Sequence, residues 1–242
     1  MSNTEKKLPL VGHLEELRNR LIKSLGALLI CFTAAFFVSD YLLSWIKRPL
    51  KTDLVFLSPA EAFWANLKVA LLGGLFISFP FLLYQAWAFI APGLFKKEKK
   101  YGLFFLFFSV IFFILGLLFC WGIVLPFGLN FLISFGEKAG IQPTLSVGLY
   151  IDFVIKFLLA FAVIFQLPLV ITLLSMMGVV APQTLSHHRR YAILFAFIFA
   201  AILTPTPDIF NQVLMAGPII VLFELGILSA RLFSRKESKT KV

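Results

Sequence analysis

Long apolar runs dominate this chain and leave only short connections between them. A helix needs about 20 mostly apolar residues to cross the hydrocarbon core of a bilayer, and soluble domains are about 45–50% apolar and about 25% charged. Here 60% of the 242 residues are hydrophobic and 14% are charged, which excludes a water-soluble globular fold. The sequence therefore predicts an all-α, polytopic membrane protein without a sizeable soluble domain. The six candidate transmembrane helices are residues 22–46, 63–90, 101–129, 150–177, 191–203 and 209–228.

The placement of Lys and Arg predicts how these helices are oriented. The N-terminal segment, the second and fourth connections and the C-terminal tail hold 16 of the 22 basic residues, whereas the opposite connections hold four. Because cytoplasmic connections carry the excess of Lys and Arg, both termini are predicted to be cytoplasmic. The chain then divides into a cytoplasmic amphipathic helix (1–21), a six-helix membrane region (22–230) and a basic cytoplasmic tail (231–242).

The fifth and sixth predicted helices are short. Residues 191–203 would give about 20 Å of helix, against a hydrocarbon core of about 30 Å. In the sixth helix, polar Asn211 and Gln212 precede the apolar part and Glu224 interrupts it. The turn between the two helices, 204–208, is predicted to lie below the outer surface, in a locally thinned membrane or a water-filled recess. Capping of this segment by neighbouring protein is an equally open interpretation.

The segment before the first span predicts an amphipathic helix that lies on the inner face. Leucines recur at helical spacing through residues 10–21, with charged residues between them, as in helices that lie along a membrane surface. Glu16 and Arg20 are four residues apart in the order that favours an ion pair, so one interpretation is a self-neutralising surface helix. His13 fits this interpretation, because one imidazole without further ligands is no metal site.

A second acidic residue predicted on the same face supports a different interpretation. Glu98 stands among four lysines in the second connection, after an aromatic and proline-containing stretch. A carboxylate can accept a bidentate pair of hydrogen bonds from a guanidinium group. Glu16 and Glu98 are therefore candidates for binding a cationic peptide with apolar flanks.

A few polar residues fall within the predicted spans. Gln166 lies in the middle of the fourth span, where a polar side chain without a partner is costly. It is expected either to bond a neighbouring backbone carbonyl or to meet a polar group of an entering helix. Asp152 and Lys156 are predicted to pair along one helix, and Lys68 is predicted to extend toward the outer surface.

Three separated stretches together resemble the TatC family. They are residues 13–21 (HLEELRNRL), 84–98 (YQAWAFIAPGLFKKE) and 204–212 (TPTPDIFNQ). The resemblance covers nearly the whole chain, in order, with the family's six spans. It implies the core receptor subunit of the twin-arginine translocase, which exports folded proteins using the proton motive force. It further implies a bacterial cytoplasmic (inner) membrane location, no enzymatic activity, and no cofactor or metal.

The resemblance also implies roles for individual residues. In the family, the N-terminal helix and the first inner loop bind the twin-arginine signal peptide, and single-span TatA and TatB-type partners dock around the fourth to sixth spans. The implied signal-peptide-binding residues are Glu16, Leu17, Arg18, Phe89, Leu94 and Glu98. The implied partner-helix-binding residues are Gln166, Leu214, Met215 and Gly217. Asp208 and Gln212 in the outer turn are candidates for a proton-linked site. A homo-oligomer within the complex is expected, and no nucleic-acid partner.

A proton-coupled small-solute transporter is the competing interpretation. Asp208, Glu224 and Gln166 would line its polar path, and the purified protein alone would carry a flux. The sequence has no recognisable internal repeat of the kind found in many secondary transporters, which favours the receptor. A membrane enzyme is less favoured still, because no metal-ligand cluster, nucleophile and base spacing or phosphate loop is found in the sequence.

Overall fold

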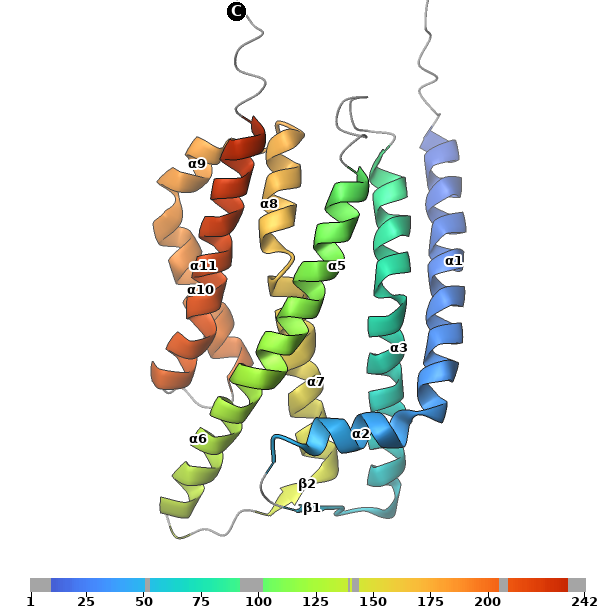
Figure 1. Ribbon diagram of the computed structural model, residues 1–242, viewed down its shortest axis with the longest axis vertical. Coiled ribbons are helices and arrows are strands. Elements are labelled where there is room, and N and C mark those ends of the chain that lie inside the picture. The colour runs from blue at the N-terminus through green and yellow to red at the C-terminus, as the bar shows by residue number, and fades with distance from the viewer. Residues whose placement is uncertain are drawn as a thin grey trace, which may run out of the picture.

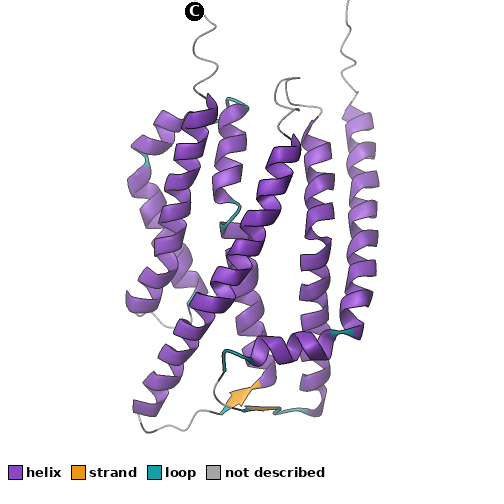
Figure 2. Cartoon of the chain, in the orientation of Figure 1, coloured by secondary structure: helices purple, strands orange, loops and turns teal. Residues whose placement is uncertain are grey.

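The computed structural model is a bundle of roughly parallel and antiparallel helices (Figure 1). It describes residues 10–50, 53–91, 102–138, 140, 144–204 and 209–234. Helix accounts for nearly all of this described part, as the colouring by secondary structure shows (Figure 2). Two strands, β1 (Leu54–Val55) and β2 (Leu145–Ser146), pair in parallel at one end of the bundle. The prediction of an all-α, polytopic fold is confirmed.

The helices follow one another along the chain as long rods with a few short connecting pieces. Their bounds are α1 Leu10–Phe37, α2 Ser39–Lys47, α3 Pro59–Ile90, α5 Gly102–Phe119, the π-helical turn η2 Cys120–Val124, α6 Leu125–Lys138, α7 Val147–Ile164, α8 Leu167–Met176, α9 Pro182–His187, α10 Arg189–Leu203 and α11 Ile209–Ser234.

Five segments of the described chain are long and apolar enough to cross a membrane. They are Gly12–Phe37, Pro59–Ile90, Gly102–Lys138, Val147–Met176 and Asn211–Leu232. Helix α10 has 15 residues, about 22 Å at 1.5 Å per residue, which is less than the hydrocarbon thickness. The fifth predicted helix is therefore short, as expected.

The sixth helix is not short, which corrects the prediction. Helix α11 has 26 residues, about 39 Å. The polar residues that were expected to shorten it have partners inside the bundle: Gln212 Nε2 donates to the Phe197 carbonyl at 3.2 Å, and Glu224 pairs with Arg189. Because a satisfied polar group costs little in a helix packed against protein, the helix continues through both positions.

The first apolar run forms two helices instead of one. Helix α1 ends at Phe37, Val38 leaves the helical region with φ −113° and ψ 11°, and α2 lies across the end of the bundle (Figure 1). Residues 10–21 are the first turns of α1, so the expectation of a separate helix along the inner face is wrong. The sequence between Leu10 and Phe37 contains no proline, and its two glycines, Gly12 and Gly26, are weak helix breakers that are tolerated inside a long helix.

Glycine residues let several helices approach closely. A Cβ added at Gly74 of α3 would lie 2.6 Å from Phe32 Cα of α1. At Gly116 of α5 it would lie 2.8 Å from the Phe161 carbonyl oxygen of α7. Small residues at helix crossings are typical of membrane bundles, where close packing contributes much of the association energy. The buried core, centred on α7, fills the space behind these contacts.

Charged side chains near the end of the bundle that carries β1 and β2 tie helices together. Lys68 of α3 contacts Asp152 of α7 at 2.5 Å, and Lys156 donates to the Ile202 carbonyl near the end of α10 at 3.2 Å. The predicted pair of Asp152 with Lys156 is therefore wrong. Packing of α3 on α7 offers Asp152 a closer cation, and Lys156 instead reaches the last turn of α10, where carbonyl groups carry partial negative charge.

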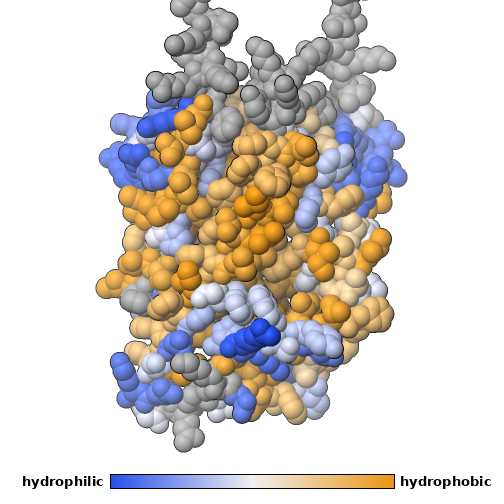
Figure 3. All heavy atoms as spheres, in the orientation of Figure 1, coloured by the Kyte–Doolittle hydropathy of each residue, from blue (hydrophilic) through white to orange (hydrophobic). Residues whose placement is uncertain are grey.

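The surface matches a protein embedded in lipid. One face of the molecule has a broad apolar band across its middle, with hydrophilic side chains gathered toward both ends (Figure 3). Helix α1 contributes strongly exposed apolar residues such as Ile30 and Phe37. Contiguous apolar surface of this extent marks a lipid-facing region in a chain with several spans.

Candidate functional site

A cluster of polar and aromatic side chains joins the first turns of α1 to the last turns of α3. Arg20 on α1 donates from Nε and Nη2 to Glu16 Oε1, at 2.9 and 2.6 Å, and from Nη1 to Gln85 Oε1 of α3 at 3.3 Å. The His13 ring stacks on the Phe89 ring, with centroids 4.4 Å apart and an angle of 16° between the planes. These five residues are called the α1–α3 cluster below.

The cluster forms because the two helices are antiparallel neighbours with matching side-chain spacing. Residues 13, 16 and 20 lie three and four positions apart, so they share one face of α1, and residues 85 and 89 share one face of α3. The two faces meet at this end of the bundle (Figure 1). Both helix faces are therefore needed to build the cluster, and neither alone predicts it.

Glu16 is held in place but keeps hydrogen-bonding capacity. Its Oε1 atom accepts both bonds from Arg20, whereas Oε2 lies 3.9 Å from His13 Nδ1, beyond hydrogen-bond distance. The Glu16 and Arg20 side chains are 23% and 25% exposed. Because an ionised carboxylate has about four acceptor positions, Oε2 can accept further donors from a ligand without loss of the Arg20 contact.

An exposed apolar surface lies beside this carboxylate. Leu14, Leu17 and Leu21 on α1 are 65%, 42% and 66% exposed. Arg18 is also exposed. An anionic group next to exposed leucines suits a ligand that combines a positive charge with an apolar segment.

The structure locates most of the predicted signal-peptide residues. Glu16, Leu17 and Arg18 lie on α1, and Phe89 lies within α3, one residue before its end. Phe89 is therefore part of a helix, within the predicted span 63–90, and its ring stacks on that of His13. Leu94 and Glu98 lie outside the described residues.

The connection that contains Glu98 begins just after Phe89, a residue of the α1–α3 cluster. It follows α3 directly and leads into α5 at Gly102. A Cβ added at Gly102 would lie 2.3 Å from Nε1 of Trp87, and the Trp87 ring stacks on Phe105 of α5 with centroids 5.9 Å apart. The close packing of Gly102 on Trp87 fixes where this connection joins α5.

The residues predicted to bind partner helices fall into two groups. Gln166 lies at the break between α7 and α8 and donates from Nε2 to the Ser109 carbonyl of α5 at 3.2 Å. Of the two interpretations of Gln166, this contact is the bond to a neighbouring backbone carbonyl. It leaves the second N–H and the carbonyl oxygen of the amide for other contacts.

The second group lies on α11. Met215 is 1% exposed and belongs to the core, which corrects the expectation that it offers an apolar docking surface. Leu214 is half-buried, and an added Cβ at Gly217 meets no atom within 4 Å. The surface available on this part of α11 is therefore formed by Leu214 and Gly217, together with exposed Val213. Asp208 lies outside the described residues, and Gln212 is bonded to α10.

Sequence reasoning missed two members of the α1–α3 cluster, His13 as a ring partner and Gln85 as a hydrogen-bond acceptor. The signal for His13 is present, since it precedes Glu16 by three positions. Gln85 gives no signal without knowledge of the helix pairing. Within the described ranges, no group of three or more His, Cys, Asp or Glu residues is placed to hold a metal ion.

Comparison with known proteins identifies the family. Residues 12–218 match the family described as Sec-independent protein translocase protein (TatC). The chain belongs to the TatC family. It is 40% identical over 238 residues to the TatC protein of Aquifex aeolicus, covering 96% of this chain and 98% of the relative. It is 39% identical over 243 residues to the TatC protein of Desulforapulum autotrophicum, covering 98% and 89% of the two chains.

A solved structure agrees with the fold of this TatC-family chain. The crystal structure of a twin-arginine translocase receptor TatC superposes with a TM-score of 0.80 and 39% identity, covering 92% of this chain and 100% of the other. The relatives are named as translocase proteins and a receptor. The chain is accordingly a multi-pass membrane component of the Sec-independent translocase and not an enzyme.

Proposed function

We propose that this TatC-family chain is the receptor and scaffold of the twin-arginine translocation system in the bacterial cytoplasmic membrane. It binds twin-arginine signal peptides at the cytoplasmic face and recruits single-span TatA and TatB-type partners, so that folded proteins are exported using the proton motive force. The observation that carries this proposal is the α1–α3 cluster, in which a fixed carboxylate lies beside exposed leucines.

Recognition of the arginine pair rests on charge and geometry. A guanidinium group of the peptide donates to Glu16 Oε2 while Arg20 keeps Oε1, and Gln85 holds Arg20 in position. The apolar part of the signal peptide lies along Leu17 and Leu21. Glu98, in the connection that leads into α5, is proposed to accept the second guanidinium group. A guanidinium group can direct two N–H groups of its rigid fork at one carboxylate oxygen, as Arg20 does at Oε1, whereas an ammonium group has no such fork.

The proposed orientation places the α1–α3 cluster at the cytoplasmic face. The first residue of α1 and the last described residue of α11 lie at the same end of the bundle (Figure 1). The excess of Lys and Arg in the connections at this end supports a cytoplasmic location for both termini. With α10 counted as the fifth of six spans, the chain crosses the membrane an even number of times, which is consistent with both termini on one side.

Recruitment of partner helices is proposed for the region around α8, α10 and α11. Gln166 keeps part of its amide free for a polar group of an entering helix, and Leu214 with Gly217 permits close approach. Several copies of the chain are expected in the assembled translocase. For the competing transporter, Glu224 of the polar path is held in a bidentate ion pair with Arg189.

Site-specific photo-crosslinking tests the receptor proposal directly. A photoreactive residue at Leu17 is expected to crosslink to a twin-arginine precursor, because Leu17 is 42% exposed and follows Glu16. The matched control position is Leu149, which is 71% exposed near the other end of the bundle. An adduct at Leu17 should disappear when the precursor carries two lysines. Equal adducts from both positions, or none from Leu17, would contradict the proposal.

The short α10 supports a second element of the mechanism, a locally thinned membrane in which clustered partner helices breach the bilayer more easily. Inserting seven leucines between Phe195 and Ala196 extends α10 by about two turns, to roughly 33 Å, and keeps the faces of both halves nearly in register. Transport is expected to fall severalfold in a vesicle import assay, while signal-peptide binding at the distant α1–α3 cluster is unchanged. Full transport by this variant would eliminate the thinning mechanism.

A further inference from the structure

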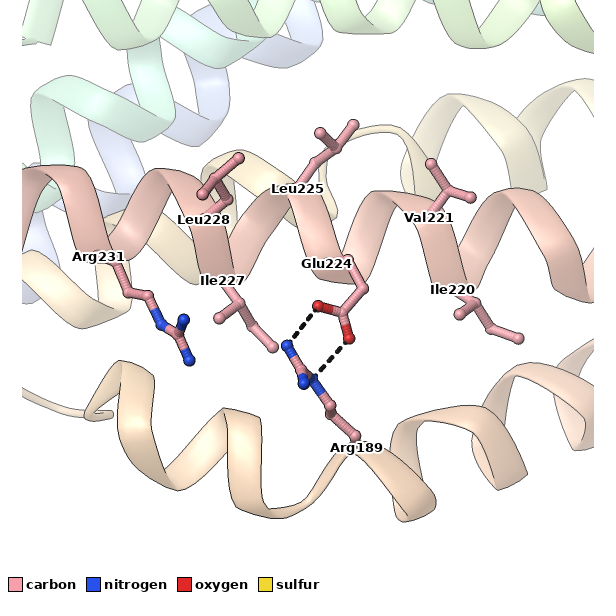
Figure 4. Close-up of a pocket in the computed structure, with 8 residues that line it drawn as sticks. All are labelled: Arg189, Ile220, Val221, Glu224, Leu225, Ile227, Leu228 and Arg231. Atoms are coloured by element: carbon pink, nitrogen blue, oxygen red, sulfur yellow. Dashed lines mark hydrogen bonds and ion pairs between the residues drawn. The ribbon is translucent and has the colours of Figure 1, made fainter.

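A groove lies between α11 and the segment formed by α9 and α10, away from the α1–α3 cluster (Figure 4). Its volume is about 360 Å³, and its lining combines two arginines, one glutamate and apolar side chains of α11. Arg189 enters from the start of α10 and Arg231 from α11, and both side chains point into the space between the helices (Figure 4). None of the functions discussed above uses these residues.

The arginines are positioned by contacts that leave hydrogen-bond donors available. Arg189 donates from Nε and Nη2 to the two carboxylate oxygens of Glu224, both at 2.8 Å, and Arg231 donates from Nη2 to Ser186 Oγ at 2.5 Å. A guanidinium group has five N–H donors. The Arg189 side chain is 50% exposed and Arg231 is also exposed, so the remaining donors of both face outward.

The charges of the groove do not cancel. Glu224 neutralises Arg189, and no carboxylate of the described residues that line the groove faces Arg231. The three ionised groups therefore sum to one positive charge. An anion with a single negative charge would balance the groove, and it would not meet a free carboxylate, because both oxygens of Glu224 are already occupied by Arg189.

The apolar side of the groove faces lipid. Val221, Leu225 and Leu228 on α11 are 59%, 44% and 56% exposed. They belong to Asn211–Leu232, a segment long and apolar enough to cross a membrane. Arg231 lies near the end of this segment, where long basic side chains reach the headgroup layer. The groove thus presents a hydrocarbon surface that continues into a cationic pair at headgroup depth.

We propose that this groove binds an anionic phospholipid of the membrane leaflet that adjoins it. Arg189 and Arg231 hold the phosphodiester group, and one acyl chain lies along Val221, Leu225 and Leu228. Basic pockets between transmembrane helices are suited to anionic headgroups. A zwitterionic phospholipid is disfavoured because its ammonium group would add positive charge beside two arginines. Glu224 acts as a positioning residue, since its bidentate contact fixes the direction of Arg189.

Lipid titration of the purified, detergent-solubilised chain followed by native mass spectrometry tests this proposal. Wild-type protein is expected to bind phosphatidylglycerol at least about tenfold more tightly than phosphatidylcholine, since the ammonium group of phosphatidylcholine adds a positive charge beside the two arginines. Arg231→Gln should lower the affinity for phosphatidylglycerol severalfold, and the double variant Arg189→Gln with Arg231→Gln should remove the preference. Arg190→Gln is the matched control, because Arg190 is exposed next to Arg189 but contacts Tyr191 instead of the groove.

Several outcomes would overturn the proposal. Arg231→Gln leaves the pair of Arg189 with Glu224 intact, so a loss of affinity in this variant reports on Arg231 itself. An unchanged affinity counts against the site. Equal loss in Arg190→Gln would mean that only general surface charge matters. Displacement of the lipid by millimolar inorganic phosphate would indicate a site for the free anion. If an added single-span partner helix covers the groove and no lipid is bound there, the groove is a protein interface and not a lipid site.

Discussion

Glu16→Gln is expected to weaken binding of a twin-arginine signal peptide to the purified chain by about tenfold or more. The substitution keeps the size of the side chain and removes its charge, so a guanidinium group meets a neutral amide in place of Oε2. A hydrogen bond to a charged group contributes about 1.5–3 kcal/mol, and about 1.4 kcal/mol corresponds to a factor of ten. Fluorescence anisotropy with a labelled signal peptide measures the change, and export of a twin-arginine substrate in cells should fall in parallel.

Glu15→Gln is the control for this experiment. Glu15 is exposed on α1 and precedes Glu16, but the α1–α3 cluster does not include it. The two variants have the same net charge, so a purely long-range effect of charge would weaken binding equally in both. A large loss only in Glu16→Gln supports direct recognition. Peptide binding by Glu16→Gln at the wild-type level would refute the assignment of this carboxylate.

Glu98 should behave in the same way, if each carboxylate accepts one of the two arginines. Glu98→Ala is expected to abolish export while the protein still inserts in the membrane. Either glutamate substitution should then reduce the affinity for a peptide with one arginine replaced by lysine less than it reduces the affinity for the peptide with both arginines. Normal export by Glu98→Ala would remove this residue from the site.

Composition and charge were sufficient to predict the class of fold. An apolar fraction this high allows only a membrane protein, and the 13 residues of the fifth run indicated a short α10. Two features could not be read from apolar runs. The break at Val38 has no proline or glycine to mark it, because tertiary packing of α2 across the end of the bundle determines it. The polar residues of α11 find partners on α10, and a sequence read one helix at a time does not contain those contacts.

For the candidate site, the sequence likewise predicted the contact within one helix and not the contacts between helices. Spacing along one helix indicated that Glu16 and Arg20 would interact, and their contact at 2.6 Å confirms it. The contacts of Arg20 with Gln85 and of His13 with Phe89 depend on how α1 aligns with α3. Lys68 and Asp152, which are 84 positions apart, show the same limitation. Ion pairs within a helix follow from sequence spacing, whereas pairs between helices require the packing.

At Gly74, α3 packs directly on the backbone of α1, and we expect Gly74→Ala to disrupt the alignment of the two helices. The added Cβ would lie 2.6 Å from Phe32 Cα and 2.7 Å from Phe32 N. Both atoms belong to the backbone of α1, so no side chain can rotate to make room and the helices must separate. Overpacking of this kind typically costs about 1–3 kcal/mol. Thermal unfolding in detergent should show a clear decrease in the melting temperature.

Gly26→Ala is the matched control, because it adds the same methyl group to α1 at a position where nothing lies within 4 Å. Its melting temperature should be unchanged or slightly higher, since alanine favours a helix over glycine by about 1 kcal/mol. Separation of α1 from α3 should also loosen the contacts of Arg20 with Gln85 and of His13 with Phe89. Gly74→Ala is therefore expected to weaken signal-peptide binding as well, although it adds no group to the α1–α3 cluster. If Gly74→Ala unfolds and binds like Gly26→Ala, the close crossing of α1 and α3 does not determine the geometry of the site.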